Sequence, residues 1–255
     1  MNFPYQFELF GNQFYFHFLF ESLAFFVGIR VYYFLRKKSV DAISDMNRLW
    51  ILLGAMMGAL LGSRIIAILE LEHFWRNYSL MELYQNKTVA GGFLGGLLGV
   101  ELTKKIIGVR IASGDLYVFP IIVGLFIGRI GCFLMGIKEN TFGIVTSFFT
   151  GMNLGDGKLR HPVALYEMVF MIVLFLFFMV IKNRKLEIGG RFKIFMILYF
   201  LYRFFVEFIK PYHPIFLNLS SIQWSAMFIF VYYWKFYCRI FKVAKNSIET
   251  SELRE

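Results

Sequence analysis

The sequence predicts an all-α membrane protein, a polytopic bundle of about seven transmembrane helices. Of its 255 residues, 58% are hydrophobic and 20% aromatic, whereas only 17% are charged, and the mean hydropathy is +0.60. A soluble fold of this length has too little interior to hide so much apolar surface. The polar residues also gather in short clusters between long apolar runs, which is how a bilayer sorts a sequence.

The apolar runs are close to the ~17–25 residues that a helix needs to cross the hydrocarbon layer. In chain order they are 14–35, 49–69, 89–107, 116–135, 163–181, 192–209 and 222–241. We expect residues 1–243 to form one transmembrane domain and the polar residues 244–255 to form a flexible cytoplasmic tail. Within the third run, small residues recur every three or four positions, which lets a neighbouring backbone approach closely: Gly91, Gly92, Gly95, Gly96 and Gly99.

Lysine and arginine predict the orientation, because short basic loops stay on the cytoplasmic side. The first, third and fifth runs are each followed or ended by clustered lysines and arginines, at 36–38, 104–105 and 182–185. The stretch after the seventh run is also rich in positive charge. The other connections are poorer. We therefore expect the N-terminus outside and the C-terminus in the cytoplasm. Residues 1–13 lack the basic start of a cleavable signal peptide, so the first helix is expected to stay in the membrane.

The net charge of +10 does not indicate a nucleic-acid partner. The basic residues lie at the ends of apolar runs, where anionic headgroups meet them, and form no stripe on a polar face. Cys132 and Cys238 are far apart in the sequence and show no metal-ligand spacing. We expect neither a disulfide framework nor a metal ion or other cofactor.

Several charges lie within predicted spans, where each costs about 2.5–3.5 kcal/mol on insertion scales. They are Glu21, Arg64, Arg129, Arg203 and Glu207. Snorkelling or a structural ion pair explains any one alone, and the last two, four residues apart, share a helix face on which they can bridge each other. Together, however, the arginines exceed the nearby acids. They predict binding of an anion, and in a bilayer that anion is a lipid phosphate.

Arg129 lies in the sequence GRIGCFLMG, between Gly128 and Gly131. Small neighbours leave room for a guanidinium that holds phosphate by two hydrogen bonds. Helix packing through the glycines is an equally good interpretation of this segment by itself.

The outer segment 137–160 is rich in glycine and long for a connection, so we expect it to have an ordered role. It leads into RHPVALYE at 160–167, where Pro162 fits the first turn of the fifth helix. His161 would then lie at the outer mouth of that helix, with Tyr166 and Glu167 one turn later. Such a histidine is either a solvated cap or, with an ordinary pKa of about 6.5, a group suited to proton transfer.

The motifs, in their order, resemble those of the prolipoprotein diacylglyceryl transferase family. These bacterial membrane enzymes attach diacylglycerol from phosphatidylglycerol to the lipobox cysteine of a lipoprotein precursor. The resemblance extends from the first span to the last and is carried by GSRI at 62–65, AGGFLGG at 90–96, GRIGCFLMG at 128–136, RHPVALYE at 160–167, RFFVE at 203–207 and SSIQW at 220–224.

The resemblance implies a multi-pass enzyme of the bacterial inner membrane whose partners are phosphatidylglycerol and the precursor's signal peptide. It implies that arginines matching Arg129 and Arg203 hold the headgroup, with Glu207 orienting the second. A cysteine thiolate displaces the glycerol phosphate, and cationic donors stabilise the departing phosphate. We take Arg129, Arg203, Glu207 and His161 as catalytic candidates. The substrate-binding candidates are Arg64, Gly92, Gly95, Gly128, Cys132, Tyr166, Glu167 and Gln223.

The chain departs from the family pattern at several positions. Ala90 stands where the family usually has a histidine, and the family's first-span tyrosine is replaced near Phe20, beside Glu21. The asparagine and the acid of the signature GRxGNFxNxE fall on Cys132 and Ile137.

These departures leave two hypotheses open. In one, the chain is a divergent transferase in which Glu21, His161 or Glu139 supplies the base that the thiol requires. In the other, it is a paralogue that binds or transports lipid, or modifies another acceptor, without the usual reaction. A transporter or channel is disfavoured, because the sequence has no repeated halves and no strongly polar pore face.

Overall fold

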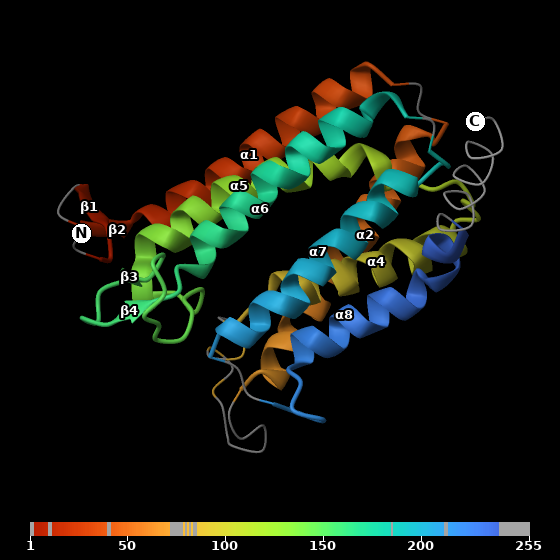
Figure 1. The fold of residues 1–255 in the computed structure, drawn as a ribbon. Helices are drawn as coiled ribbons and strands as arrows, with labels where there is room; N and C mark the ends of the chain where they lie inside the picture. The colour runs from red at the N-terminus through yellow and green to blue at the C-terminus, as the bar shows by residue number, and fades with distance from the viewer. Residues whose placement is uncertain are drawn as a thin grey trace, which may run out of the picture. The chain divides into compact units, whose positions relative to one another are not determined.

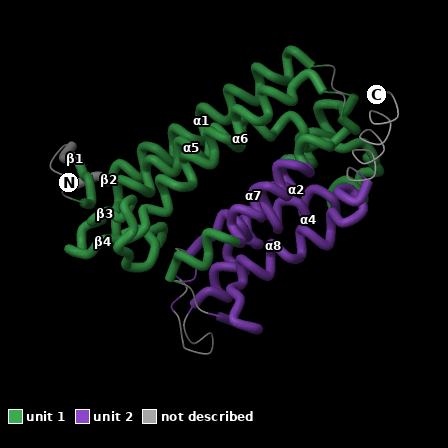
Figure 2. Tube along the Cα trace, viewed as in Figure 1, with its two compact units in different colours: residues 1–52, 102–192, 205–212 green, residues 53–101, 193–204, 213–255 purple. Residues whose placement is uncertain are grey.

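The computed structural model describes residues 3–9, 12–39, 42–71, 79, 81, 83, 86–184, 186–211 and 214–239. The chain divides into two compact units that are interleaved in the sequence (Figure 2). Unit 1 comprises residues 1–52, 102–192 and 205–212, and unit 2 comprises residues 53–101, 193–204 and 213–255. The predicted tail, 244–255, lies outside the described residues. The prediction that residues 1–243 form one domain stays a prediction.

Unit 1 is built on three long helices, α1 (Phe16–Lys37), α5 (Val118–Met135) and α6 (Val163–Val180). They run side by side, and α5 packs against both of the others (Figure 1). Glycines let α1 and α5 approach, since a Cβ on Gly28 or Gly124 would lie 3.5 Å from a carbonyl oxygen of the facing helix. Much of the unit's interior is apolar, with Val118, Ile122, Met171, Leu174 and Phe178 all buried.

Short strands decorate one end of unit 1. The strands β1 (Gln6–Leu9) and β2 (Asn12–Tyr15) form an antiparallel hairpin that leads directly into α1. The backbone N–H of Tyr5 donates to the carbonyl of Leu134 at 2.9 Å, which fastens this arm to the C-terminal end of α5. In the outer segment, β3 (Met152–Asn153) pairs with β4 (Leu159–Arg160). The sequence analysis did not anticipate the N-terminal hairpin.

Short 3-10 turns extend several helices: η1 (Asp115–Tyr117) precedes α5, η2 (Gly136–Lys138) follows it, and η3 (Ile181–Asn183) follows α6. At η1, the carboxylate of Asp115 accepts hydrogen bonds from the N–H groups of Gly189 and Phe192 at 2.8 and 3.0 Å. These bonds join the start of the α5 segment to the chain that enters α7. Unit 1 thus has an ordered polar end at each side of its apolar helices.

Unit 2 holds most of α2 (Asp45–Leu69), α4 (Val89–Ile106), most of α7 (Gly190–Val206) and α8 (Ser221–Tyr232). The small residues of α4 face glycines of α2, as the spacing predicted. A Cβ on Gly62 would lie 2.5 Å from the carbonyl oxygen of Gly91, and one on Gly95 would overlap the carbonyl of Gly58. The prediction of a close backbone approach is therefore confirmed.

Aromatic packing joins α4 to α7. The ring of Phe93 stands edge-on to Tyr199, with centroids 4.8 Å apart, and Tyr199 and Phe200 are completely buried. At the start of α8, the side chain of Ser220 accepts from the Gln223 N–H while the Gln223 side chain accepts from the Ser220 N–H, a capping box. The N–H of Ser221 donates to the carboxylate of Glu70 at 2.9 Å, which ties α8 to the end of α2.

Each predicted apolar run contains a described α-helix, and the structure is mostly helical, with two short strand pairs beside the helices. Within the part of the chain that the structure describes, four helical segments are long and apolar enough to cross a membrane: Phe16–Lys37, Asp45–Leu69, Asp115–Lys138 and Val163–Asn183. Large apolar side chains cover the outside of α1, where Phe18 and Phe25 are 71% and 70% exposed. Such a surface suits lipid rather than water. The chain is a membrane protein, and the number of spans and the placement of its termini stay predictions.

Candidate active site

The centre of unit 1 holds an ion pair between two helices. Arg129 Nε on α5 lies 2.9 Å from Glu167 Oε2 on α6. Only 9% of Arg129 and 2% of Glu167 are exposed. A carboxylate at this distance balances the buried positive charge of the guanidinium. Sequence reasoning had singled out both residues but had not paired them.

The same guanidinium lies beside a sulfur atom. Arg129 Nη1 donates to the Sγ of Cys132 at 3.5 Å, one helical turn further along α5. A Cβ on Gly131 would lie 3.0 Å from the Phe20 Cβ, so α1 packs tightly against this stretch. A Cβ on Gly128, in contrast, would meet nothing within 4 Å. The two glycines therefore differ, because Gly131 permits close helix packing whereas a side chain at Gly128 would meet no neighbour.

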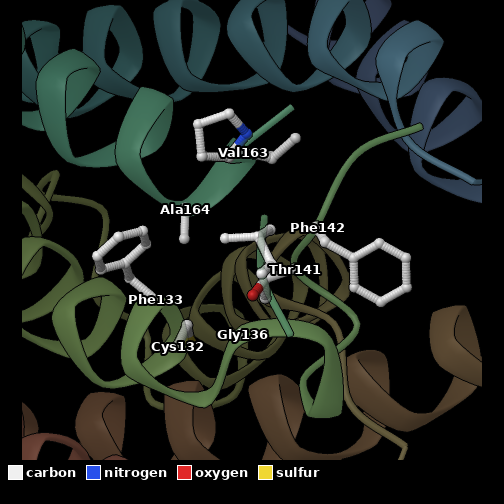
Figure 3. Close-up of a pocket in the computed structure, with 9 residues that line it drawn as sticks. Cys132, Phe133, Gly136, Thr141, Phe142, Val163 and Ala164 are labelled. Atoms are coloured by element: carbon white, nitrogen blue, oxygen red, sulfur yellow. The ribbon is translucent and has the colours of Figure 1, made fainter. Parts of the chain in front are cut away.

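A small pocket, partly open at the surface, lies next to Cys132 (Figure 3). It is bounded by the end of α5, the outer segment and the start of α6. Its lining is mainly apolar and consists of Cys132, Phe133, Gly136, Thr141, Phe142, Leu154, Pro162, Val163 and Ala164. The ring of Phe142 is turned away from the other lining side chains. The pocket is thus an apolar space near the end of α5, the helix that carries Arg129.

His161 takes part in a chain of hydrogen bonds at the start of α6. Its Nδ1 lies 3.0 Å from the hydroxyl of Tyr166, and that hydroxyl also bonds the hydroxyl of Thr150. The carbonyl of His161 accepts from the N–H of Gly143 at 2.8 Å. His161 and Tyr166 are therefore brought together, as their motif predicted, and they tie the outer segment to α6.

A salt bridge closes the turn of the outer segment. Arg160 Nε lies 2.8 Å from Asp156 Oδ2. This hydrogen bond, helped by one from the N–H of Lys158, lowers the pKa of Asp156 below its ordinary value of 3.8. These contacts hold the turn of the outer segment in place, and a role for the segment stays a prediction.

The base candidates lie in three places within unit 1. Glu21 is half-buried on α1, where its Oε2 lies 3.7 Å from His17 Nε2. Glu139 is half-buried directly after η2, and its carbonyl accepts from the N–H of Thr141 at 2.6 Å. His161 lies at the start of α6. Sequence reasoning missed His17, although the four-residue spacing from Glu21 on a helix could have identified it.

The remaining candidates lie in α2, α4, α7 and α8. Arg203 on α7 is 5% exposed, and Glu207, which begins the 3-10 turn η4 (Glu207–Ile209), is 1% exposed. Gln223 is completely buried, and besides its capping bonds its Nε2 donates to the Phe204 carbonyl at 3.2 Å. Its amide therefore has a structural role, and substrate binding by Gln223 stays a prediction.

Two glycines and an arginine complete the set. Gly95 serves the contact between α4 and α2, where no Cβ fits, whereas a Cβ on Gly92 would come no closer than 3.9 Å to its neighbours. Arg64 is half-buried on α2. The structure describes all three in unit 2, and their contact with a substrate stays a prediction.

Comparisons with known proteins agree with the motifs. Residues 4–239 match the family profile described as prolipoprotein diacylglyceryl transferase. Relatives named phosphatidylglycerol–prolipoprotein diacylglyceryl transferase include one from Wolbachia pipientis, which is 33% identical over 74% of this chain and 76% of its own length. Another, from Nitratidesulfovibrio vulgaris, is 32% identical over 73% of this chain and 71% of its length.

Similarity also extends over almost the whole chain. A relative of the same name from Campylobacter lari is 27% identical over 92% of this chain and 93% of its own length. The family prediction drawn from the motifs is confirmed, and the matched range includes the Arg129–Glu167 pair, His161 and Arg203. The chain belongs to the prolipoprotein diacylglyceryl transferase family.

Proposed function

We propose that this chain is an enzyme that transfers diacylglycerol from phosphatidylglycerol to the lipobox cysteine of a lipoprotein precursor. The family supplies the reaction, and the residues of unit 1 supply a chemical reason for it. The observation that carries the proposal is the buried Arg129, which is paired with Glu167 and contacts Cys132, a residue that lines the pocket.

A guanidinium in a membrane protein is suited to an anionic headgroup. Its planar fork matches two phosphate oxygens, and it stays charged at every physiological pH. Glu167 pairs with Arg129 between two packed helices, so a counter-charge is in place beside the guanidinium before the lipid arrives. Such preorganisation avoids a reorganisation cost during the reaction. In our proposal Arg203, with Glu207 orienting it, is a second guanidinium that binds the headgroup.

The reaction needs a thiolate and a stabilised leaving group. The sulfur attacks the glycerol carbon of the diacylglycerol moiety that bears the phosphate. A carbon–sulfur bond forms as the carbon–oxygen bond breaks, and the electron pair departs with the phosphate oxygen of glycerol phosphate. Cationic donors at the phosphate stabilise this charge more in the transition state than in the ground state, which lowers the barrier.

The decisive experiment is a rescue of cells depleted of their own transferase. Cells that express this chain should convert a lipoprotein precursor to its diacylglyceryl form, detected with a labelled diacylglycerol moiety. Arg129→Ala, at matched membrane levels, should not. Failure of the wild-type chain to rescue at normal levels would refute the proposal.

A second function is favoured by one observation. Ala90, at the position of the family histidine, is 1% exposed and has no proton-accepting side chain. If the missing imidazole has no substitute, the chain binds or transports phosphatidylglycerol, or modifies another acceptor, without the usual transfer. A purified protein that binds phosphatidylglycerol but transfers nothing to a lipobox peptide would support this alternative.

We further propose the topology that the basic connections predict: about seven spans in the bacterial inner membrane, with the N-terminus outside and the C-terminus in the cytoplasm. The precursor's signal peptide would then approach from within the same membrane. Reporter fusions after residues 38, 110, 184 and 243 should report the cytoplasm. A periplasmic signal from these fusions would contradict the orientation.

A further inference from the structure

The start of helix α1 carries a histidine and a glutamate that face each other. His17 Nε2 lies 3.7 Å from Glu21 Oε2, one helical turn along the same face. The other ring nitrogen, Nδ1, is enclosed in the protein and makes no hydrogen bond within the described ranges of the chain. When a neutral imidazole directs its Nε2–H toward a carboxylate, the lone pair is on Nδ1. In that tautomer His17 is a proton acceptor with the carboxylate of Glu21 beside its other nitrogen.

This pair is next to the candidate active site. A Cβ on Gly131 would lie 3.1 Å from the His17 Cα and 3.2 Å from its carbonyl oxygen, so the first turn of α1 packs on the stretch 128–132. At the same end of unit 1, the N–H of Tyr5 bonds the carbonyl of Leu134. The beginning of α1 therefore meets the end of α5, where the guanidinium of the site lies.

We propose that His17 is the general base that takes the proton from the acceptor thiol, and that Glu21 is a positioning residue that holds the imidazole. This inference rests on the proposed transfer to a cysteine. The S–H proton moves to Nδ1 of His17, and the thiolate forms the carbon–sulfur bond as the carbon–oxygen bond breaks. The imidazolium then returns the proton to solvent or to the released phosphate ester. The step requires no further reactant.

Among the described residues, His161 also lies near the site, but it is less suited to this role. Its Nδ1 contacts the Tyr166 hydroxyl, which is in turn engaged by Thr150. Its backbone is also fixed by Gly143, so the residue fastens the outer segment. His17 combines an imidazole with a neighbouring carboxylate and a ring nitrogen that has no protein partner among the described residues, so this nitrogen is available to a substrate proton. It would supply from α1 the imidazole that Ala90 on α4 lacks.

The test uses the purified full chain in nanodiscs that contain phosphatidylglycerol, with lipobox peptides as acceptors. One peptide carries an ordinary cysteine, and another has lysines beside it that lower the thiol pKa. The variants are His17→Asn, Glu21→Gln and His161→Asn. Ser22→Ala, on the exposed side of the same helix turn, is the matched control. Size-exclusion profiles and phosphatidylglycerol binding report whether each variant is folded.

We expect His17→Asn to lower kcat about 100-fold or more with little change in the KM for phosphatidylglycerol, because general bases typically contribute ~10²–10⁴-fold. The more acidic thiol should recover part of this loss, since it needs less help from a base. Glu21→Gln should lose about 10–100-fold, the usual effect of removing a partner that orients a histidine. Ser22→Ala should behave as the wild type.

A folded His17→Asn protein with wild-type kcat would overturn the inference. Thiol-acidity rescue found for His161→Asn instead of His17→Asn would also overturn it and would assign the base to His161. If the His17 variant does not fold, the same kcat and rescue criteria apply to Glu21→Gln, which keeps the side-chain shape. No transfer by the wild-type protein would refute the proposed function itself, which separates the two failures.

Discussion

Removal of the carboxylate of Glu167 should damage the protein in two measurable ways. Glu167 is 2% exposed and its Oε2 lies 2.9 Å from Arg129 Nε, so Glu167→Ala leaves a positive charge in the centre of unit 1 without this partner. Breaking a buried pair from one side costs about 3–5 kcal/mol. Glu167→Gln keeps the shape and one acceptor oxygen, and the loss should be about 1–3 kcal/mol.

The assay is unfolding of the purified protein in mixed micelles, followed by the circular dichroism of its helices. Activity is measured separately, as diacylglyceryl transfer. The double variant Arg129→Met with Glu167→Leu removes both charges, so it should recover most of the stability lost in Glu167→Ala, because apolar replacements of a buried pair are often neutral or stabilising. It should nevertheless remain inactive. A Glu167→Ala protein as stable as the wild type would refute the role of this pair.

Three further predictions concern the frame of the site. Gly95→Val should destabilise the contact between α4 and α2 by about 1–3 kcal/mol in the same unfolding assay, whereas Gly92→Ala, which has space, should leave stability close to that of the wild type. The folded pKa of Asp156 lies below its ordinary value of 3.8, so its contribution to stability is present above pH 3.8 and is lost as the pH falls through the folded pKa. Hydrogen exchange of residues 138–160 in the wild type should therefore increase below about pH 3.8. Asp156→Asn should already show this faster exchange at pH 6. Tyr166→Phe removes the hydroxyl that His161 contacts, so it should increase hydrogen exchange in the same segment by an amount equivalent to about 1 kcal/mol. Unchanged exchange would contradict the idea that the His161–Tyr166 contact holds this segment.

Much of the fold could be predicted from the sequence because the bilayer imposes a simple rule on it. Long apolar runs become helices, and the run predicted at 163–181 is α6 with η3, Val163 to Asn183. The last run, predicted as 222–241, contains an α-helix that ends at Tyr232. Hydrophobicity alone does not report where a helix ends, since an apolar stretch can continue past a break in the backbone.

The glycines and the embedded charges could also be found from the sequence, but their partners could not. Spacing within one helix predicted that α4 would approach a neighbour, and the neighbour proved to be α2. Arg129 and Glu167 lie on separate helices, and no local pattern specifies which spans pack together. The family motifs placed both residues in the set of candidates without pairing them.

Two features were missed for a different reason. Residues 1–13 gave no sequence signal, and part of that stretch forms the β1–β2 hairpin, because short strands with weak alternation carry little periodicity. His17 was overlooked because Glu21 was considered alone, as an isolated charge in a span. A four-residue helix spacing joins the two, and the structure places them on one face.

Replacing a guanidinium by an amine tests directly whether the arginines hold the lipid phosphate. Arg129→Lys and Arg203→Lys keep the positive charge but lose the planar fork that binds two phosphate oxygens. We expect each purified variant to be folded with normal helix content. Each should transfer diacylglycerol from phosphatidylglycerol at least about 100-fold more slowly than the wild type, which is the usual effect of removing a preorganised donor. Transfer at the wild-type rate by both lysine variants would contradict the claim that guanidinium groups hold the lipid phosphate.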